Sequence, residues 1–144
     1  MNESAVLQNI VRREGRSLLQ YTSEAFPWTT APERNTLDQL QMLITEERDA
    51  VAALSNFLAK RRITPPYLGA YPMTFTNMNY VSLEHLLPRL LEYQRQAIAR
   101  LEQDRRQVID PAVIESVDKI LTMKREHLSK LEELVKTVIV SPTR

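Results

Sequence analysis

Hydrophobic residues recur every three or four positions in four long segments of this 144-residue chain. This spacing places them on one face of an α-helix and leaves the opposite face polar. It predicts four helices, over residues 3–25, 36–62, 80–108 and 111–137. The fold class expected from this pattern is all-α.

Several residues mark the expected ends of these helices. Asn35 and Thr36 are both good N-caps for the second helix, because their side chains accept hydrogen bonds from free backbone N–H groups. Asp110 followed by Pro111 predicts the start of the fourth helix, since proline suits the first helical position. Pro88 lies inside the third helix and is expected to kink it or to delay its start.

Residues 63–79 have no helical period and contain three prolines and a glycine. Seventeen extended residues reach roughly 56 Å, whereas a 27-residue helix is about 40 Å long. This segment can therefore carry the chain back to the other end of the helices, as a long crossover between the second and third. Residues 138–144 are expected to form a tail. Together these elements predict a single domain over residues 1–144, a four-helix bundle with one long crossover.

Composition narrows the chemistry that the chain can perform. Hydrophobic residues make up 43% of it, enough to build a core at this length. Two glycines are too few for sheets with tight turns or for a glycine-rich phosphate loop. The lack of cysteine excludes disulfides and zinc–thiolate sites. The sequence also contains no catalytic motif, so an enzyme is not the favoured class.

Charge and hydropathy indicate which partners to expect. The net charge of +1 argues against a dedicated nucleic-acid binder, which normally carries a clear basic excess. No run of about 18 apolar residues is present, so no membrane span is expected. The N-terminal residues lack the pattern of a signal peptide, and the expected location is the cytoplasm.

Each predicted apolar face is interrupted near its middle by one polar residue, and these residues are Glu14, Glu47, Gln94 and Lys124. The two glutamates each lie eleven residues from the corner between the first two helices. Gln94 and Lys124 are spaced almost equally about the turn at Asp110. Because the helices joined by a short turn are antiparallel, the four side chains are expected at one level inside the bundle.

This layer has a specific electrostatic requirement. A carboxylate in a hydrocarbon core is costly unless a cation compensates its charge, and two neighbouring carboxylates repel each other. Lys124 is the expected partner, since its long stem can be buried while its ammonium group meets Glu14 and Glu47. Gln94 is expected to complete the hydrogen bonding. The alternative is that the interruptions are incidental, with Glu14 or Lys124 extending to the surface.

In its helical layout and at these positions the sequence resembles the ferritin-like, rubrerythrin-like di-iron carboxylate proteins. That family carries a glutamate on each of two helices and a Glu-x-x-His motif on each of the other two. Glu14 and Glu47 match two of those glutamates, but Ala50 stands where a histidine would follow Glu47.

The second half of the chain departs further from the family pattern. Gln94 stands in place of a glutamate, and Lys124 followed by His127 stands in place of the last Glu-x-x-His. Of the six ligands that the resemblance implies, three are therefore present, namely Glu14, Glu47 and His127. The resemblance implies a ferritin-like bundle with a degenerate metal site.

Three functional hypotheses follow. The first is a non-enzymatic structural or protein-interaction module that needs no cofactor, with a second copy of the chain or another protein as its partner. The second is a divergent metal-binding protein, an oxidase or metal store, that holds iron or manganese through Glu14, Glu47 and His127. The third is a small-molecule binder with a pocket under the aromatic residues of the crossover.

Other polar residues are expected to be less informative. His85 has no partner at metal-ligand spacing, and Glu46 lies one position off the apolar stripe. The basic runs that include Arg12 and Arg100 are mixed with acidic residues, which is typical of solvated helix faces and favours them over a phosphate-binding patch. Gly15 costs about 1 kcal/mol relative to alanine in a helix, and close approach of a neighbouring helix is the expected reason.

Overall fold

The computed structural model describes residues 2–25 and 27–140, and the regular structure in these ranges is helical. Its elements are α1 (Glu3–Gly15), α2 (Leu18–Thr22), η1 (Ala31–Glu33), α3 (Arg34–Lys60), η2 (Met73–Met78), α4 (Leu83–Arg106) and α5 (Pro111–Val140), where η marks a 3-10 helix. No strand occurs in the described ranges, although Trp28 and Ser82 form an isolated parallel bridge. The all-α prediction is therefore confirmed. None of the helices in these ranges combines the length and apolar character that a membrane crossing requires.

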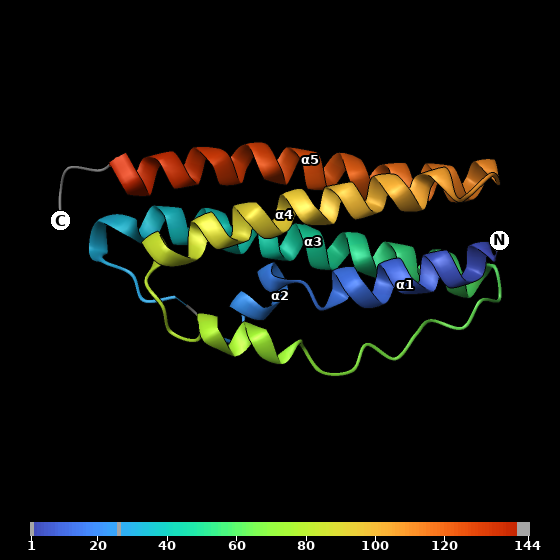
Figure 1. Cartoon of the computed structure of the whole chain (residues 1–144), viewed down its shortest axis with the longest axis horizontal. Helices are drawn as coiled ribbons and strands as arrows, with labels where there is room; N and C mark the ends of the chain where they lie inside the picture. The colour runs from blue at the N-terminus through green and yellow to red at the C-terminus, as the bar shows by residue number, and fades with distance from the viewer. Residues whose placement is uncertain (1, 26, 141–144) are drawn as a thin grey trace.

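The long helices lie side by side along the molecule (Figure 1). α4 packs on α5, α5 on α3, α3 on α1, and α1 on α4, so the contacts close into a ring. α3 and α4 run in the same direction, while α1 and α5 run the opposite way. The polar layer does not by itself determine this direction, because Gln94 lies near the middle of its helix and would stay level with the layer in either orientation.

The segment between α3 and α4 returns the chain along the α1 side of the molecule (Figure 1). It contains the short helix η2, which the sequence pattern did not predict. Phe75 of η2 is buried, and its ring centroid lies 5.7 Å from that of Tyr21, 6.4 Å from that of Tyr71 and 5.4 Å from that of Tyr93. This aromatic packing holds the crossover against the helices.

The interior is divided into two apolar clusters. One contains residues of α1, the N-terminal part of α5 and the C-terminal parts of α3 and α4. The other contains the opposite parts of α3, α4 and α5 together with residues of α2 and Phe75. In α3, α4 and α5 the change from one cluster to the other falls at a buried polar residue, namely Glu47, Gln94 and Lys124. Glu14, also buried, lies near the C-terminal end of α1, between the apolar residues of α1 and those of α2. A polar layer therefore separates two hydrophobic cores.

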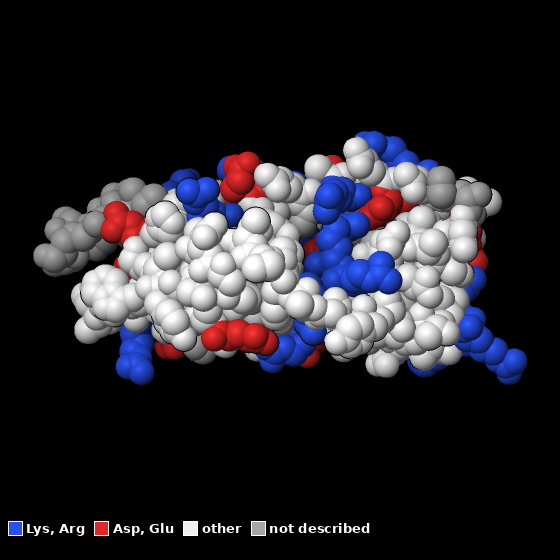
Figure 2. All heavy atoms as spheres, turned by 60° about the horizontal axis from the view of Figure 1, so that its bottom comes forward, with Lys and Arg blue, Asp and Glu red and all other residues white. Residues whose placement is uncertain are grey.

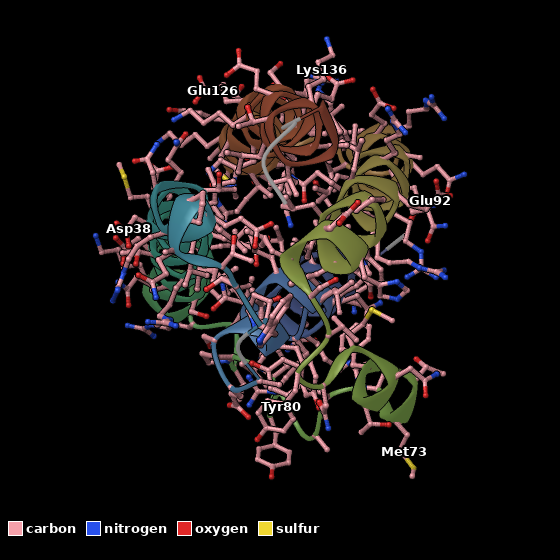
Figure 3. All side chains as sticks on the ribbon, turned by 90° about the vertical axis from the view of Figure 1, so that its left-hand side faces the viewer. Asp38, Met73, Tyr80, Glu92, Glu126 and Lys136 are labelled. Carbon is pink, nitrogen blue, oxygen red and sulfur yellow. The ribbon has the colours of Figure 1, made fainter. Side chains whose placement is uncertain are left out.

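Many charged side chains outside this layer point to solvent. Figure 3, seen along the helices, shows Asp38, Glu92, Glu126 and Lys136 directed outward around the molecule. This is the distribution expected of amphipathic helices that share one interior.

Several helix boundaries differ from the predicted ones. The helix expected over residues 3–25 is broken at Arg16, because Ser17 leaves helical geometry and caps α2 through a hydrogen bond from the Gln20 N–H. Asn35 and Thr36 lie inside α3 and do not cap it, since a capping box of Thr30 and Glu33 starts the helical segment upstream.

The third and fourth predicted helices also shift at their ends. α4 begins at Leu83, with Pro88 well inside it, because Ser82 accepts a hydrogen bond from the His85 N–H and caps the helix. Asp110 does begin α5, accepting a hydrogen bond from the Ala112 N–H at 2.9 Å. α5 continues through Val140, so the first part of the predicted tail is helical. The remainder, residues 141–144, lies outside the described ranges.

Gly15 faces both the crossover and the neighbouring helix α3, but the closest approach is that of the crossover. A Cβ at this position would lie 3.0 Å from Cδ1 of Leu68, and 3.6 Å from Cγ1 of Val51 on α3. The first distance is tighter than normal packing, whereas the second is an ordinary contact. The absence of a side chain at Gly15 therefore makes room for Leu68.

We expect Gly15→Ala to be more favourable by about 1 kcal/mol in a Leu68→Ala background than in the native chain. In the native chain the gain in helix propensity is offset by overpacking against Leu68, and removal of that side chain relieves the offset. Urea unfolding of the four proteins of this double-mutant cycle measures the difference. Equal effects of Gly15→Ala in both backgrounds would show that Leu68 does not set the requirement for glycine.

Candidate functional site: a buried ion-pair layer

The Lys124 ammonium group lies between two buried carboxylates. Its Nζ is 2.6 Å from Oε1 of Glu14 and 2.5 Å from Oε2 of Glu47. All three side chains are at most 2% exposed. The cluster joins α1, α3 and α5, so it fixes three of the long helices relative to one another.

Glu47 receives two further hydrogen bonds, and both come from the region where the first helix breaks. Its Oε1 accepts from Oγ of Ser17 at 2.5 Å and from Nε2 of Gln20 at 3.1 Å. Ser17 is the N-cap of α2. Because the helix breaks at Arg16, the hydroxyl group of Ser17 and the side chain of Gln20 in the following turn both reach Glu47. Both oxygens of Glu47 are therefore satisfied inside the protein, as a buried carboxylate requires.

Glu14 links the layer to the surface. Its Oε2 accepts from Nε of Arg13 at 3.2 Å, and Nη2 of Arg13 lies 2.8 Å from Oδ2 of Asp104 on α4. Charges thus alternate in sign from Glu47 through Lys124, Glu14 and Arg13 to Asp104. Alternation keeps each like-charged pair separated by an opposite charge, which lowers the electrostatic cost of the layer.

Gln94 is buried, but it has a different partner from the expected one. Its Nε2 donates to the backbone carbonyl oxygen of Lys124 at 2.9 Å. It therefore contacts the main chain of α5 and does not complete the hydrogen bonding of the carboxylates. Gln94 positions the α5 backbone beside α4 at the level where Lys124 projects inward.

The electrostatics of the cluster favour a charged lysine. Burial by itself disfavours the ammonium form, but the carboxylates of Glu47 and Glu14 outweigh it, and the pKa of Lys124 is raised above its ordinary value. The stabilisation of the folded state by the charged Lys124 is complete below the pKa of an unfolded lysine, near 10.4. It is lost only as the pH rises through the raised pKa of the folded state.

A second pair joins the buried His127 to the half-exposed Glu46, and the sequence pattern does not predict it. Nε2 of His127 lies 2.9 Å from Oε1 of Glu46, and the side chain of His127 is 2% exposed while that of Glu46 is 49% exposed. Glu46 sits one position off the apolar stripe of α3, which is why it was expected to be a free surface charge. The pairing depends on α5 lying beside α3, and the periodicity of hydrophobic residues along one helix does not show which helix lies beside it.

The protonation state of His127 follows from its surroundings. Burial lowers the pKa of His127, although Glu46 acts in the opposite direction. The neutral ring carries one proton, and placing it on Nε2 allows donation to Glu46. Nδ1 has no hydrogen-bond partner, and in this tautomer it carries no proton that would need one.

The donor set does not fit the di-metal centre that the family resemblance implies. Lys124 places a positive charge on both glutamates, at the position where a metal cation would bind. The third expected ligand, His127, is directed to Glu46 through Nε2. In the described ranges no group of three or more histidine, aspartate or glutamate side chains is arranged to hold a metal ion. His85 is exposed near the start of α4 and belongs to no such group.

No protein-family model, curated protein or solved structure matches this chain. The fold and the site therefore define the class of this protein by themselves. It is an all-helical protein with a lysine–glutamate cluster buried between two apolar cores.

We expect Lys124→Met to lower the free energy of unfolding by about 3–5 kcal/mol, because it leaves two buried carboxylates without a counter-charge. Chemical denaturation measures the loss. Lys119→Met on the same helix is the matched control, since that lysine is 76% exposed and its pairing with Glu115 is expected to contribute little.

A combined variant separates charge from packing. Glu14→Gln and Glu47→Gln, added to Lys124→Met, keep the shapes of the side chains but remove the stranded charges. We expect this triple variant to recover most of the stability lost in Lys124→Met. If Lys124→Met costs no more than Lys119→Met, the cluster does not contribute in the way described.

His127 predicts a pH dependence of stability in the acidic range. Because its pKa is lowered in the folded state, the unfolded chain binds the proton more readily, and stability falls as the pH drops below about 6.5. We expect the decrease between about pH 7 and 5 to be shallower in His127→Gln than in the native chain. Thermal unfolding across this range tests it, with the exposed His85→Gln as the control for loss of a histidine. If the stability of the native chain and of His127→Gln changes with pH in the same way, His127 is not the source of this pH dependence.

Proposed function

We propose that this chain is a four-helix bundle of ferritin-like layout that acts as a structural or protein-interaction module. In this proposal the buried cluster of Glu14, Glu47 and Lys124 stands where ferritin-like proteins hold their metal ions. The parallel course of α3 and α4 and the crossover between them support the layout (Figure 1). The positions of the two glutamates, on α1 and α3, support the proposed correspondence between the cluster and a ferritin-like metal site.

The single observation that carries the proposal is the position of the Lys124 ammonium group, within 2.6 Å of both carboxylates. A bound metal would compensate the glutamates with an exchangeable cation that has open coordination positions. Lysine compensates them with a covalently attached cation that has none. Such a layer holds helices in register but offers no site for redox chemistry or metal storage.

One side of the surface has the apolar character of a protein-binding site. Large apolar side chains are exposed on the crossover and its flanks, and Figure 3 shows Tyr80 and Met73 projecting into solvent on that side. Tyr67 is 89% exposed and Met73 86% exposed. Exposed aromatic and methionine side chains are enriched in protein interfaces, so this side is the favoured one for a second copy of the chain or another protein.

The test compares the native chain with Lys124→Glu after both have been loaded with Fe(II), Mn(II) or Zn(II). Elemental analysis and light scattering are performed on the same chromatographic peak. We expect the native chain to elute as an assembly of two or more copies without stoichiometric metal. Lys124→Glu should gain metal, because it replaces the ammonium group with a third carboxylate beside Glu14 and Glu47.

Two outcomes would count against the proposal. Stoichiometric metal in the native chain that disappears in Glu47→Ala would make this a divergent metalloprotein, which is the alternative function. Lys124→Met is the matched control for Lys124→Glu, since it removes the ammonium group without adding a ligand. Equal metal uptake by these two variants would show that the layer is not a converted metal site.

A further inference from the structure

A cleft lies beside the buried layer, between α1 and α4 and under the crossover. It has a volume of about 610 Å³ and is lined on its polar side by Arg12, Arg13, Arg16, Arg100 and Asp104. A second hollow of about 480 Å³ shares Arg13 and Arg100 with it and extends to Glu14. Figure 2 shows Lys and Arg side chains gathered in one hollow of this face, with largely uncharged surface on either side.

The arginines of the cleft are only partly neutralised. Arg13 is paired with Glu14 and Asp104. The other three have no carboxylate within ion-pair distance among the residues that the structure describes. Arg12 donates to the side chain of Asn9 at 3.1 Å. Arg100 lies within α4, and among the described residues its guanidinium group has no hydrogen-bond partner. The cleft therefore carries excess positive charge.

Arg16 is held in the cleft by neutral groups. Its Nε donates to the carbonyl oxygen of Gly69 on the crossover at 2.7 Å, and its guanidinium group lies 4.8 Å from the centroid of the Tyr71 ring. These contacts orient the guanidinium group without cancelling its charge. The crossover thus contributes to the cleft by fixing one of its cations.

The remaining wall of the cleft is apolar or aromatic, and it includes Leu68, Pro72 and Tyr93. Tyr93 is half-buried, and its pKa is raised by burial and then by the carboxylate of Glu14, so its hydroxyl group stays protonated at neutral pH. It can therefore donate a hydrogen bond to an anion. The volume lies within the usual range for small organic ligands and greatly exceeds what inorganic phosphate needs.

We propose that the cleft between α1 and α4 binds a small organic phosphate, with the phosphate group held by Arg12, Arg16 and Arg100 and the organic part placed against Leu68, Pro72 and Tyr93. Guanidinium groups suit phosphate oxygens because they present several N–H donors in one plane. The large volume and the apolar wall favour an organic phosphate over a bare anion.

Calorimetric titration of the full chain with ADP, pyrophosphate and adenosine tests this proposal. We expect saturable binding of ADP, weaker binding of pyrophosphate and no binding of adenosine, with ADP affinity falling as salt is added. Arg100→Gln and Arg12→Gln should each weaken ADP binding roughly tenfold, which is the effect of losing one charge-assisted hydrogen bond. Both arginines are exposed, so both variants are expected to remain folded.

Arg105→Gln is the matched control, because Arg105 lies on the same helix but pairs with Asp118 outside the cleft. It should leave ADP affinity unchanged. The proposal is overturned if neither ADP nor pyrophosphate binds at millimolar concentration, if adenosine binds as well as ADP, or if Arg105→Gln weakens binding as much as Arg100→Gln. None of these results would affect the proposed role of the buried layer, since the side chains of Arg12 and Arg100 form no ion pair with Glu14 or Glu47, which Lys124 compensates.

Discussion

The ion pairs of Lys124 with Glu14 and Glu47 are the interaction on which the rest of the structure depends. A lysine at 1% exposure in an apolar interior is tolerable only because two carboxylates meet it, and the carboxylates are tolerable only because of the lysine. Each charged group therefore requires the other two. Since they come from α1, α3 and α5, the requirement fixes how those helices are placed along one another.

This requirement gives the helices a single register. Apart from Phe75, the buried residues of the two apolar clusters are leucine, isoleucine and valine, which could pack in several shifted arrangements. A shift of one helical turn would place Glu47 or Lys124 against aliphatic side chains without a counter-charge. The polar layer thus specifies the alignment of the helices, a role that buried polar groups are known to have in helical assemblies.

The buried layer is also connected to the surface of the protein through Arg13. Arg13 joins Glu14 to Asp104, and the same arginine lines the cleft between α1 and α4. Internal charge is compensated by a fixed cation, while the surplus cations face the cleft. The ammonium group of Lys124 thus lies between the two buried carboxylates, and Arg12, Arg16 and Arg100 line the cleft beside them.

The sequence by itself determined the helical class, the approximate helix ranges and the four polar residues that interrupt the apolar faces. These features follow from periodicity along one helix, which is a local property. The tertiary structure alone decided that the first helix breaks at Arg16 so that Ser17 reaches Glu47, that Gln94 binds the Lys124 main chain, and that Glu46 meets His127. It also decided that α3 and α4 run parallel and that arginines from α1 and α4 share a cleft. These features depend on which faces meet across the interior, and residues far apart in the chain carry no local pattern that records their contact.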